Sequence, residues 1–410
     1  MGPFPFSDKG LHPNHAPPPP SWGRSIRAEG EERVGGAVRT ITNYICGNPV
    51  RYASIDLLRT VAIALMVLVH FLENLAGVLW PVAGFGAPLF AFLAGVSLRL
   101  WVRSQEGKGT PAADITRVAV RRGLFLFALG LAFNFFVWLP DDVYNWDVLT
   151  MIGTGLILLA FARDMPAGFL VFVSALIFTL APFLRVVADY DAHWLEFYFQ
   201  HDRSLPEIAI GYFATGYFPL FPWVLFPLCG YAAGKVVFPD PGEPGTPSVR
   251  PLLTWGGVLV AASVSLRVAR PFLPDPLPTT LVKGWTMFPA SPEYVTGVLG
   301  LALVLFGGLH VWVDRRRNLD GAPRLLTAAR TMSQHSLSIY LLHHVLHLWP
   351  LWVYGYIVNE DATDLWRKAM PVEAALALVP VCLGVCYLVA WLMARRGWPS
   401  AEGVARWVCD

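Results

Sequence analysis

Two ionisable residues separated by ten others, Arg59 and His70, carry the first chemical signal in the sequence. In an α-helix this spacing is close to three whole turns and about 16 Å of axial rise, so both side chains leave the helix on one face. A neutral histidine near pH 7 can take a proton from an attacking hydroxyl or amine, which makes His70 a candidate general base. Asp56 shares the face with Arg59 and can pair with it. The alternative is that Arg59 anchors the helix and His70 bonds a neighbouring helix.

A second group lies far along the chain, where Tyr340, His343, His344 and His347 follow one another at helical spacing. His343 and His347 are i,i+4 neighbours, and Tyr340 shares a face with both His343 and His344. Two histidines can belong to a metal site, but zinc takes at least three protein ligands and the sequence places no third nearby. We therefore expect no metal. The group is interpreted as a wall of a substrate cavity or as a set of interhelical hydrogen bonds.

The elements that position these residues are predicted to cross a membrane. Of the 410 residues, 55% are hydrophobic and only 15% are charged, and the mean hydropathy is +0.49. A soluble protein carries nearer a quarter of charged residues. Apolar runs of about 20 residues match the roughly 30 Å of hydrocarbon that a helix must cross. The sequence thus predicts an all-α polytopic membrane protein of about ten transmembrane helices, at 55–78, 82–103, 118–138, 147–163, 167–187, 218–238, 250–269, 293–313, 335–356 and 372–394.

The segments outside these spans predict the topology. Residues 1–48 are rich in Pro, Gly, Arg and Glu and are expected to form a disordered cytosolic tail, 49–396 the transmembrane domain, and 397–410 a short cytosolic tail. Basic joints are expected in the cytoplasm and acidic joints outside, so both termini are predicted to be cytoplasmic. The basic joints carry Arg99, Arg103, Lys108, Arg117, Arg121, Arg122, Arg315, Arg316, Arg317, Arg324, Arg330, Arg395 and Arg396. The acidic joints carry Asp141, Asp142, Asp147, Asp189, Asp191, Glu196, Asp202, Glu360, Asp361 and Asp364.

Two irregular stretches point to a cavity. Pro219, Pro222 and Pro227 fall within nine residues and must break or kink the helix that contains them. Non-helical backbone at membrane depth survives only beside protein or a water-filled cavity, so the break indicates either a site wall or a kink packed against neighbours. The long joint at 189–217 is rich in aromatic residues, which favours packing on the membrane face or a lid over a free loop.

The sequence from Arg51 to His70 resembles the opening of the transmembrane acyltransferases related to heparan-α-glucosaminide N-acetyltransferase, and its Arg-x10-His spacing is similar to a motif of the wider acyltransferase-3 superfamily. Further motifs at 86–97, 146–153, 218–223, 288–294 and 336–343 are similar, in the same order, to those of bacterial proteins of that group. The resemblance extends to about Ala394. It implies a location in the bacterial inner membrane.

The resemblance implies transfer of an acetyl group from cytosolic acetyl-CoA to an amino or hydroxyl group of a sugar or glycan at the outer face. It suggests His70 as general base, with His343 and His344 as further catalytic candidates. Arginines on the cytoplasmic side can bind the phosphates of CoA, or can serve only as positive-inside anchors. The candidates for CoA are Arg59, Arg121 and Arg122, and those for the acceptor are Asp56, Asn134, Asp147 and Tyr340.

The sequence departs from the family at one point and leaves other function classes open. In lysosomal members the catalytic histidine follows the first span, whereas here 71–85 contains no histidine and His70 lies within the span. A transporter or flippase of a polar substrate also uses buried polar residues and broken helices. A third possibility is a scaffold without catalysis that assembles other proteins, and the Pro-rich tail is the only feature of the sequence that supports it. The sequence suggests no nucleic-acid partner, and an oligomer is possible without being indicated.

Overall fold

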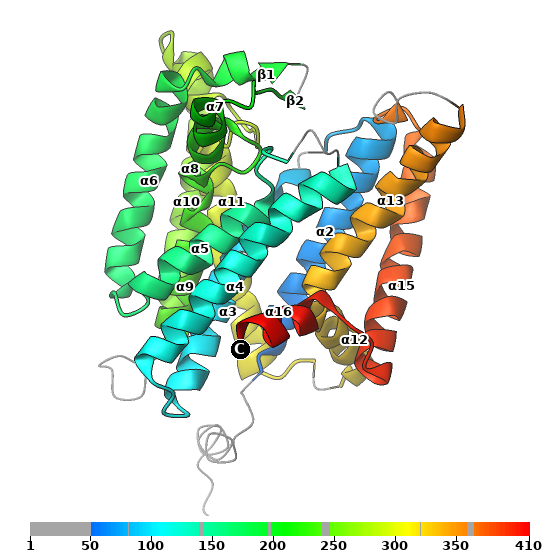
Figure 1. The fold of residues 1–410 in the computed structure, drawn as a ribbon. Helices are drawn as coiled ribbons and strands as arrows, with labels where there is room; N and C mark the ends of the chain where they lie inside the picture. Colours follow the sequence, from blue (N-terminus) through cyan, green and yellow to red (C-terminus); the bar gives the residue numbers. More distant parts are fainter. Residues whose placement is uncertain are drawn as a thin grey trace, which may run out of the picture. The chain divides into compact units, whose positions relative to one another are not determined.

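The computed structural model describes residues 51–80, 82–138, 143–195, 198–239, 247–319, 321–358 and 365–410. These residues are almost entirely helical, which confirms the predicted all-α polytopic fold (Figure 1). The predicted tail at 1–48 lies outside the described residues. So do several residues of the predicted acidic joints, namely Asp141, Asp142, Glu196, Glu360, Asp361 and Asp364.

A helix lies at each of the predicted spans. Their observed bounds differ from the predicted ones by a few residues, as expected where capping rather than hydropathy ends a helix. The helices are α2 (Ala53–Ala76), α3 (Gly86–Glu106), α4 (Ala112–Phe133) continued by a π-helical turn (Asn134–Trp138), α5 (Val148–Ala162), α6 (Ala167–Val187), α9 (Leu225–Val237), α10 (Arg250–Ala269), α11 (Pro292–Leu309) continued by a π-helical turn (His310–Arg315), α13 (Ser336–Val358) and α15 (Val372–Arg396).

Seven helical segments of the described chain are long and apolar enough to cross a membrane: 53–76, 112–138, 167–187, 205–237, 250–272, 292–315 and 372–396. The chain is therefore a multi-pass membrane protein. Among the other three predicted spans, α5 has 15 residues, α3 carries Arg99 and Arg103, and α13 carries three histidines. Polar residues lower the hydropathy of α3 and α13, and they are tolerated in a bilayer when they face protein or a cavity.

The helix breaks at the first two of the three prolines, Pro219 and Pro222, whereas Pro227 lies in the first turn of α9. Phe221 has an extended backbone, and short segments replace a continuous span before α9 begins at Leu225. The remaining elements are short: Ala83–Phe85, Tyr190–His193, β1 (Trp194–Leu195) paired antiparallel with β2 (Tyr198–Phe199), α7 (Leu205–Ile210), Gly211–Thr215, α8 (Leu220–Trp223), Arg270–Phe272, Leu277–Val282, α12 (Pro323–Gln334) and α16 (Ala401–Cys409).

Close helix packing positions the cavity walls. A Cβ atom at Gly95 of α3 would lie 2.0 Å from the carbonyl oxygen of Pro227, and one at Gly230 of α9 would lie 1.9 Å from that of Phe92. Small residues allow membrane helices to approach this closely, because lipid gives no hydrophobic drive for helices to associate. On the other side of the cavity, Ile63 and Val67 of α2 pack in an apolar cluster with residues of α13 and α15.

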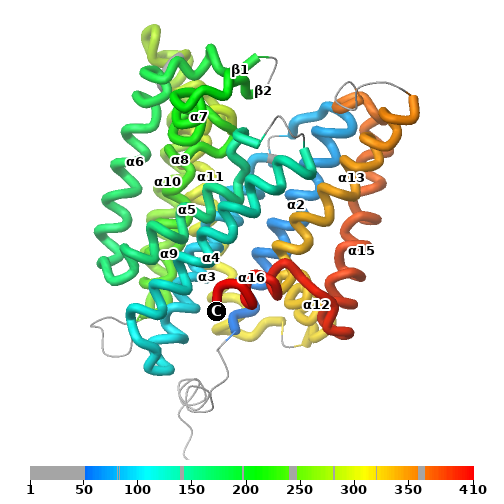
Figure 2. Tube along the Cα trace, viewed as in Figure 1, coloured from blue at the N-terminus to red at the C-terminus, as the bar shows by residue number. Residues whose placement is uncertain are grey.

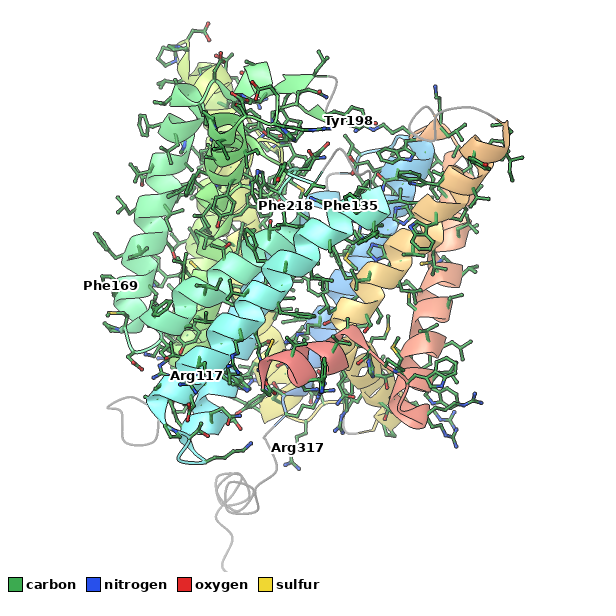
Figure 3. The ribbon with its side chains drawn as sticks, viewed as in Figure 1. Arg117, Phe135, Phe169, Tyr198, Phe218 and Arg317 are labelled. Carbon is green, nitrogen blue, oxygen red and sulfur yellow. The ribbon has the colours of Figure 1, made fainter. Side chains whose placement is uncertain are left out.

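The predicted basic and acidic joints lie at opposite ends of the described helices. Arg117 and Arg317 mark one end, called here the arginine-rich end, and Tyr198 marks the other, called the loop end (Figure 3). The segment 397–410, predicted to be a short tail, contains the helix α16, which lies at the arginine-rich end and packs against α4 and α13 (Figure 2).

The contact between α3 and α9 gives the first prediction. We expect Gly230→Ala to destabilise the protein by about 1–3 kcal/mol, because the added methyl group has to push the backbone of α3 away. Gly384→Ala in α15 is the matched control, since a Cβ atom there meets no described atom within 4 Å. Thermal unfolding in detergent, followed by tryptophan fluorescence, measures both. Equal melting temperatures for the two variants would contradict the close packing.

Candidate functional site

A cavity of about 1740 Å³ lies among the helices and is lined by residues from both ends. Arg51, Arg122 and Arg406 contribute from the arginine-rich end, and His201 and Arg367 contribute from the loop end. Its apolar walls come from α3, α4 and α5, and from the face of α2 that is turned away from the apolar cluster. Arg59 and His70 both line it, which confirms that they share a face of α2.

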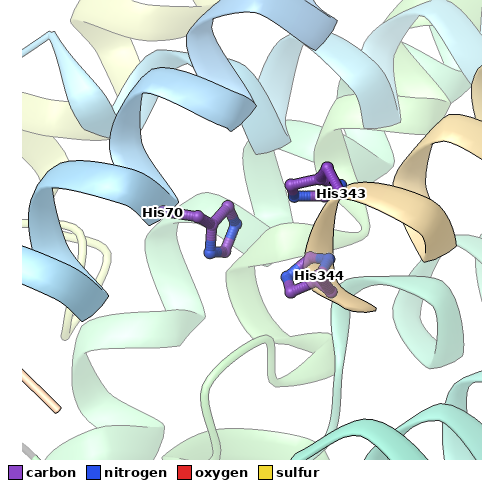
Figure 4. A group of neighbouring side chains, drawn as sticks. All are labelled: His70, His343 and His344. Carbon is purple, nitrogen blue, oxygen red and sulfur yellow. The ribbon is translucent and has the colours of Figure 1, made fainter. Parts of the chain in front are cut away.

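The structure brings His70 together with His343 and His344, although more than 270 residues separate them. His70 projects from α2 toward the two histidines of α13 (Figure 4). Its ring centroid lies 4.4 Å from that of His344 and 5.3 Å from that of His343. The nearest ring nitrogens of the three all lie within 4.8 Å of one another. His70 thus adds a third ring nitrogen near the pair, which the sequence argument against a metal did not include.

Hydrogen bonds within α13 set the tautomers of its histidines. Nδ1 of His343 lies 3.0 Å from the carbonyl oxygen of Ile339, and Nδ1 of His344 lies 2.9 Å from that of Tyr340. A carbonyl oxygen can only accept, so each Nδ1 carries the hydrogen and each Nε2 presents a lone pair. Both Nε2 atoms are buried and have no hydrogen-bond partner among the described residues. Two lone pairs therefore converge beside His70.

His347 has the same tautomer but a different environment. Its Nδ1 donates to the carbonyl oxygen of His343 at 2.7 Å, and its Nε2 lies 2.9 Å from Nδ2 of Asn74, which donates to it. The lone pair of His347 is therefore in use. Asn74 itself lines the cavity and ties α2 to α13 one turn beyond His70.

Three of the predicted acceptor contacts form one wall of the cavity. Asp147 is the N-cap of α5, where its Oδ1 accepts from the Leu149 amide at 2.8 Å, so the capping interpretation of this residue is confirmed. Its Oδ2 accepts from the hydroxyl of Tyr340 at 2.6 Å. Asn134 lies nearby in the same lining and donates to the carbonyl oxygen of Val143 at 3.2 Å. Asp147 thus links α5 to α13 beside the histidines.

At the arginine-rich end, Arg59 and Asp56 do not pair as predicted. The guanidinium of Arg51 binds the Asp56 carboxylate through two hydrogen bonds, of 2.7 and 2.8 Å. Arg59 instead donates to the hydroxyls of Ser97 and Ser333, and it lines the cavity. Asp56 is absent from the described lining. The pairing prediction was wrong because helical spacing alone did not include Arg51, which lies just before the helix.

The two arginines predicted as a pair point to different environments. Arg122 lines the cavity, stacks over the ring of Trp101 at 4.5 Å and binds the carboxylate of Asp410 with hydrogen bonds of 2.7 and 2.8 Å. Arg121 is exposed and does not belong to the described lining. Consecutive residues on a helix diverge by about 100°, so one of the two had to turn away.

Helix α16 forms part of the cavity wall at this end, which the sequence reasoning missed. The Glu402 carboxylate accepts from the amides of Leu337 and Ser338 at 2.7 and 3.0 Å, and thereby caps the first turn of α13. Together with Asp410, which holds Arg122, it fastens α16 between α13 and α4. Residues 337 and 402 are far apart in the chain and no sequence pattern relates them. This contact could therefore not be predicted from the sequence.

At the loop end, the long predicted joint packs through its aromatic side chains. The ring of Trp194 lies 5.0 Å from Tyr217 and 5.4 Å from Phe288, which confirms packing rather than a free loop. Tyr198 lines the cavity beneath the guanidinium of Arg367, whose carbon lies 4.8 Å from the ring centroid. This stacked pair was not predicted.

His201 adds a polar group to the loop end. Burial lowers the pKa of His201 below its ordinary value, and the neighbouring Arg203 lowers it further. The neutral ring accepts a hydrogen bond from the amide of Arg203 at Nδ1, over 3.2 Å. His201 therefore presents an uncharged imidazole to the cavity at neutral pH.

Comparison with protein families gives one match. The family model for "Heparan-alpha-glucosaminide N-acetyltransferase, catalytic" matches residues 51–266, which is more than half of the chain. The matched stretch contains Arg59, His70, Asn134 and Asp147, whereas the histidines of α13 lie beyond it. A search of curated proteins finds no match.

The link between Asp147 and Tyr340 gives the second prediction. Tyr340→Phe removes the only hydroxyl that reaches Asp147 Oδ2 among the described residues, and we expect a loss of about 1–3 kcal/mol because a buried acceptor is left without its partner. Tyr354→Phe on the same helix is the control, since its side chain is half exposed. Thermal unfolding measures both variants. A double-mutant cycle with Asp147→Asn should show strong coupling, and additive effects would exclude the link.

Proposed function

The chain belongs to the heparan-α-glucosaminide N-acetyltransferase catalytic family, as its motifs predicted, and from this we propose that it acetylates a sugar or glycan by using acetyl-CoA. Family membership makes it a membrane acetyltransferase. The acyl donor, the acceptor and the direction are our proposal. Acetyl-CoA would bind from the arginine-rich end, which is the cytoplasmic end by the positive-inside rule, and the acceptor would enter from the loop end.

One observation carries the proposal: His70 lies in a single cavity that residues from both ends line. A thioester approaching from one end and an acceptor from the other can therefore meet at one imidazole, without either crossing the bilayer. Holding both reactants in this way replaces an encounter in solution by a reaction within one complex.

The residues support a direct transfer. The acceptor oxygen or nitrogen attacks the thioester carbonyl carbon while His70 takes its proton. The new C–O or C–N bond forms, the C–S bond breaks, and CoA leaves as a thiolate that recovers the proton from His70. Asp147, Asn134 and Tyr340 line the wall where a sugar would place its other hydroxyls, and they offer both donors and acceptors to it.

The arginine-rich end offers contacts for the phosphates of CoA. Arg59 and Arg122 line the cavity there, and a planar guanidinium binds phosphate through two parallel hydrogen bonds. The Arg122 guanidinium already donates hydrogen bonds to the Asp410 carboxylate, which takes the place that a phosphate would take. Acetyl-CoA would therefore compete with Asp410 for Arg122, whereas the hydroxyl partners of Arg59 are neutral. Because Arg121 is exposed, we assign the CoA contact to Arg122 rather than to the pair.

A transporter also binds its substrate in a cavity among its helices, which is reached from each end of the protein in turn. Transport does not consume acetyl-CoA, so release of CoA that depends on an acceptor distinguishes the two functions.

His70→Ala gives the central test of the proposed function. We expect turnover to fall by about 10²–10⁴-fold, the usual contribution of a general base, with little change in the affinity for acetyl-CoA. The assay supplies acetyl-labelled acetyl-CoA to the purified protein and follows CoA release with candidate glycans as acceptors.

Two further variants separate the base from a structural role. His70→Asn keeps a hydrogen-bonding side chain but cannot act as a base near pH 7, so it should be as inactive as His70→Ala. His193→Asn is the matched control, because His193 pairs with Glu207 outside the described lining of the cavity. Wild-type turnover in a stably folded His70→Asn protein would remove His70 from the mechanism.

Arg59→Ala tests the side from which the donor binds. We expect the KM for acetyl-CoA to rise by about 10- to 100-fold, because a charge-assisted hydrogen bond contributes about 1.5–3 kcal/mol. Arg59→Lys should recover only part of the affinity, since an ammonium cannot match the planar fork. Arg117→Ala removes the same charge at the same end from an exposed ion pair and serves as control. An unchanged KM in Arg59→Ala would exclude Arg59 from the donor site.

A further inference from the structure

We propose that His70, His343 and His344 bind one divalent transition-metal ion, such as Zn²⁺, and that the bound ion blocks acetyl transfer. The binding site stands on the geometry of the three imidazoles alone. The block rests on the proposed function, because it requires His70 to be the base.

Two of the three ligand atoms are already fixed for metal binding. The Nδ1 hydrogens of His343 and His344 are held by backbone carbonyl oxygens, which directs both Nε2 lone pairs to the same place. Most metal-bound histidines donate a hydrogen bond from the other ring nitrogen, because this bond sets the tautomer and the orientation of the ring. Both Nε2 atoms are buried without a partner among the described residues. A buried acceptor without a hydrogen-bond partner destabilises the protein, so a cation bound by both Nε2 atoms would relieve this cost twice.

His70 supplies the third ligand and leaves the fourth position open. It faces the other two from α2, and its side chain lines the cavity, so a fourth ligand can come from water or from a substrate. The ligand nitrogens lie within 4.8 Å of one another. Tetrahedral zinc with bonds of about 2.0–2.1 Å needs them about 3.4 Å apart. The approach would come mainly from rotation of the His70 side chain, because Nδ1 hydrogen bonds hold the rings of His343 and His344.

The donor set selects the class of metal. Three imidazole nitrogens suit Zn²⁺, Cu²⁺ or Ni²⁺, whereas Mg²⁺ and Ca²⁺ require oxygen ligands. Asp147 is a carboxylate of the same cavity, but its oxygens are held by Tyr340 and by the Leu149 amide. His347 is likewise occupied by Asn74. The ligand set is therefore three histidines.

A bound ion would block acetyl transfer because it uses the lone pair that His70 needs as a base. A neutral imidazole whose Nδ1 or Nε2 lone pair is given to a metal ion has none left to take the proton of the acceptor. The ion would also occupy the place where the acceptor and the thioester carbonyl have to meet. Metal-loaded protein should therefore be inactive, and removal of the ion should restore activity.

The binding experiment uses purified full-length protein that has been treated with a chelator and then titrated with Zn²⁺ against a competing coloured chelator. We expect one ion per chain. His343→Asn and His344→Asn should each weaken binding by more than the roughly 10–100-fold that is lost when a residue hydrogen-bonded to a metal ligand is replaced. His347→Asn is the matched control on the same helix and should still bind one ion. Mg²⁺ should not displace Zn²⁺.

The activity arm separates this inference from the proposed function. Acetyl transfer should fall at least tenfold when the site is filled with Zn²⁺ and should return after chelation. Failure of the wild type to bind, or binding that survives His343→Asn and His344→Asn, would overturn the metal site while leaving His70 as the base. Full activity of zinc-loaded protein would overturn the block, and activity that requires Zn²⁺ would overturn it as well.

Discussion

Hydrogen bonds inside a single helix determine which atoms of the cavity can do chemistry. In α13 the Nδ1 hydrogens of His343 and His344 are taken up by carbonyl oxygens one turn earlier, so that the Nε2 lone pairs are the atoms left to react. This arrangement exists only while α13 remains helical through these residues and keeps its register against α2. The apolar cluster that contains Ile63, Val67 and Ile339, together with the hydrogen bond between Asn74 and His347, holds that register. The position of His70 relative to His343 and His344 depends on the same packing of α2 against α13.

The two sides of the cavity are built by different means. On the α3 and α9 side, glycine allows the backbones to touch, and this side contributes mostly apolar wall. On the α2 and α13 side, polar contacts between helices add to the apolar cluster in holding the arrangement. Such contacts are costly to leave unmade in a bilayer, because hydrocarbon offers no replacement partners. The α3 and α9 side therefore shapes the cavity, and the α2 and α13 side supplies the polar groups that could react within it.

Much of the fold could be predicted from the sequence because hydrophobic length and helical period are local properties. The spans, the shared face of Arg59 and His70, the helix break at Pro219 and Pro222 and the cap at Asp147 all follow from residues near one another in the chain. Which helices are neighbours is not local, and periodicity carries no information about it. The meeting of His70 with His343 was therefore missed, and with it the third nitrogen that a metal would need. The role of α16 in the cavity wall was missed for the same reason, because Glu402 and Asp410 bond to residues 65 and 288 positions away in the chain.

A cavity that receives side chains from both ends of a membrane protein raises the question of leakage. Water-filled continuity through the bilayer would let protons and small ions run down the membrane potential, at a continuous cost to the cell. The rings of Phe133 and Trp138 pack beside His344, with centroids 4.8 and 5.6 Å from that of the imidazole. Apolar rings at a constriction disfavour a continuous water column, as hydrophobic gates do in channels. Rings packed beside the histidines would in this way exclude a continuous water column, so that two aqueous substrates could approach one point while the membrane stays tight.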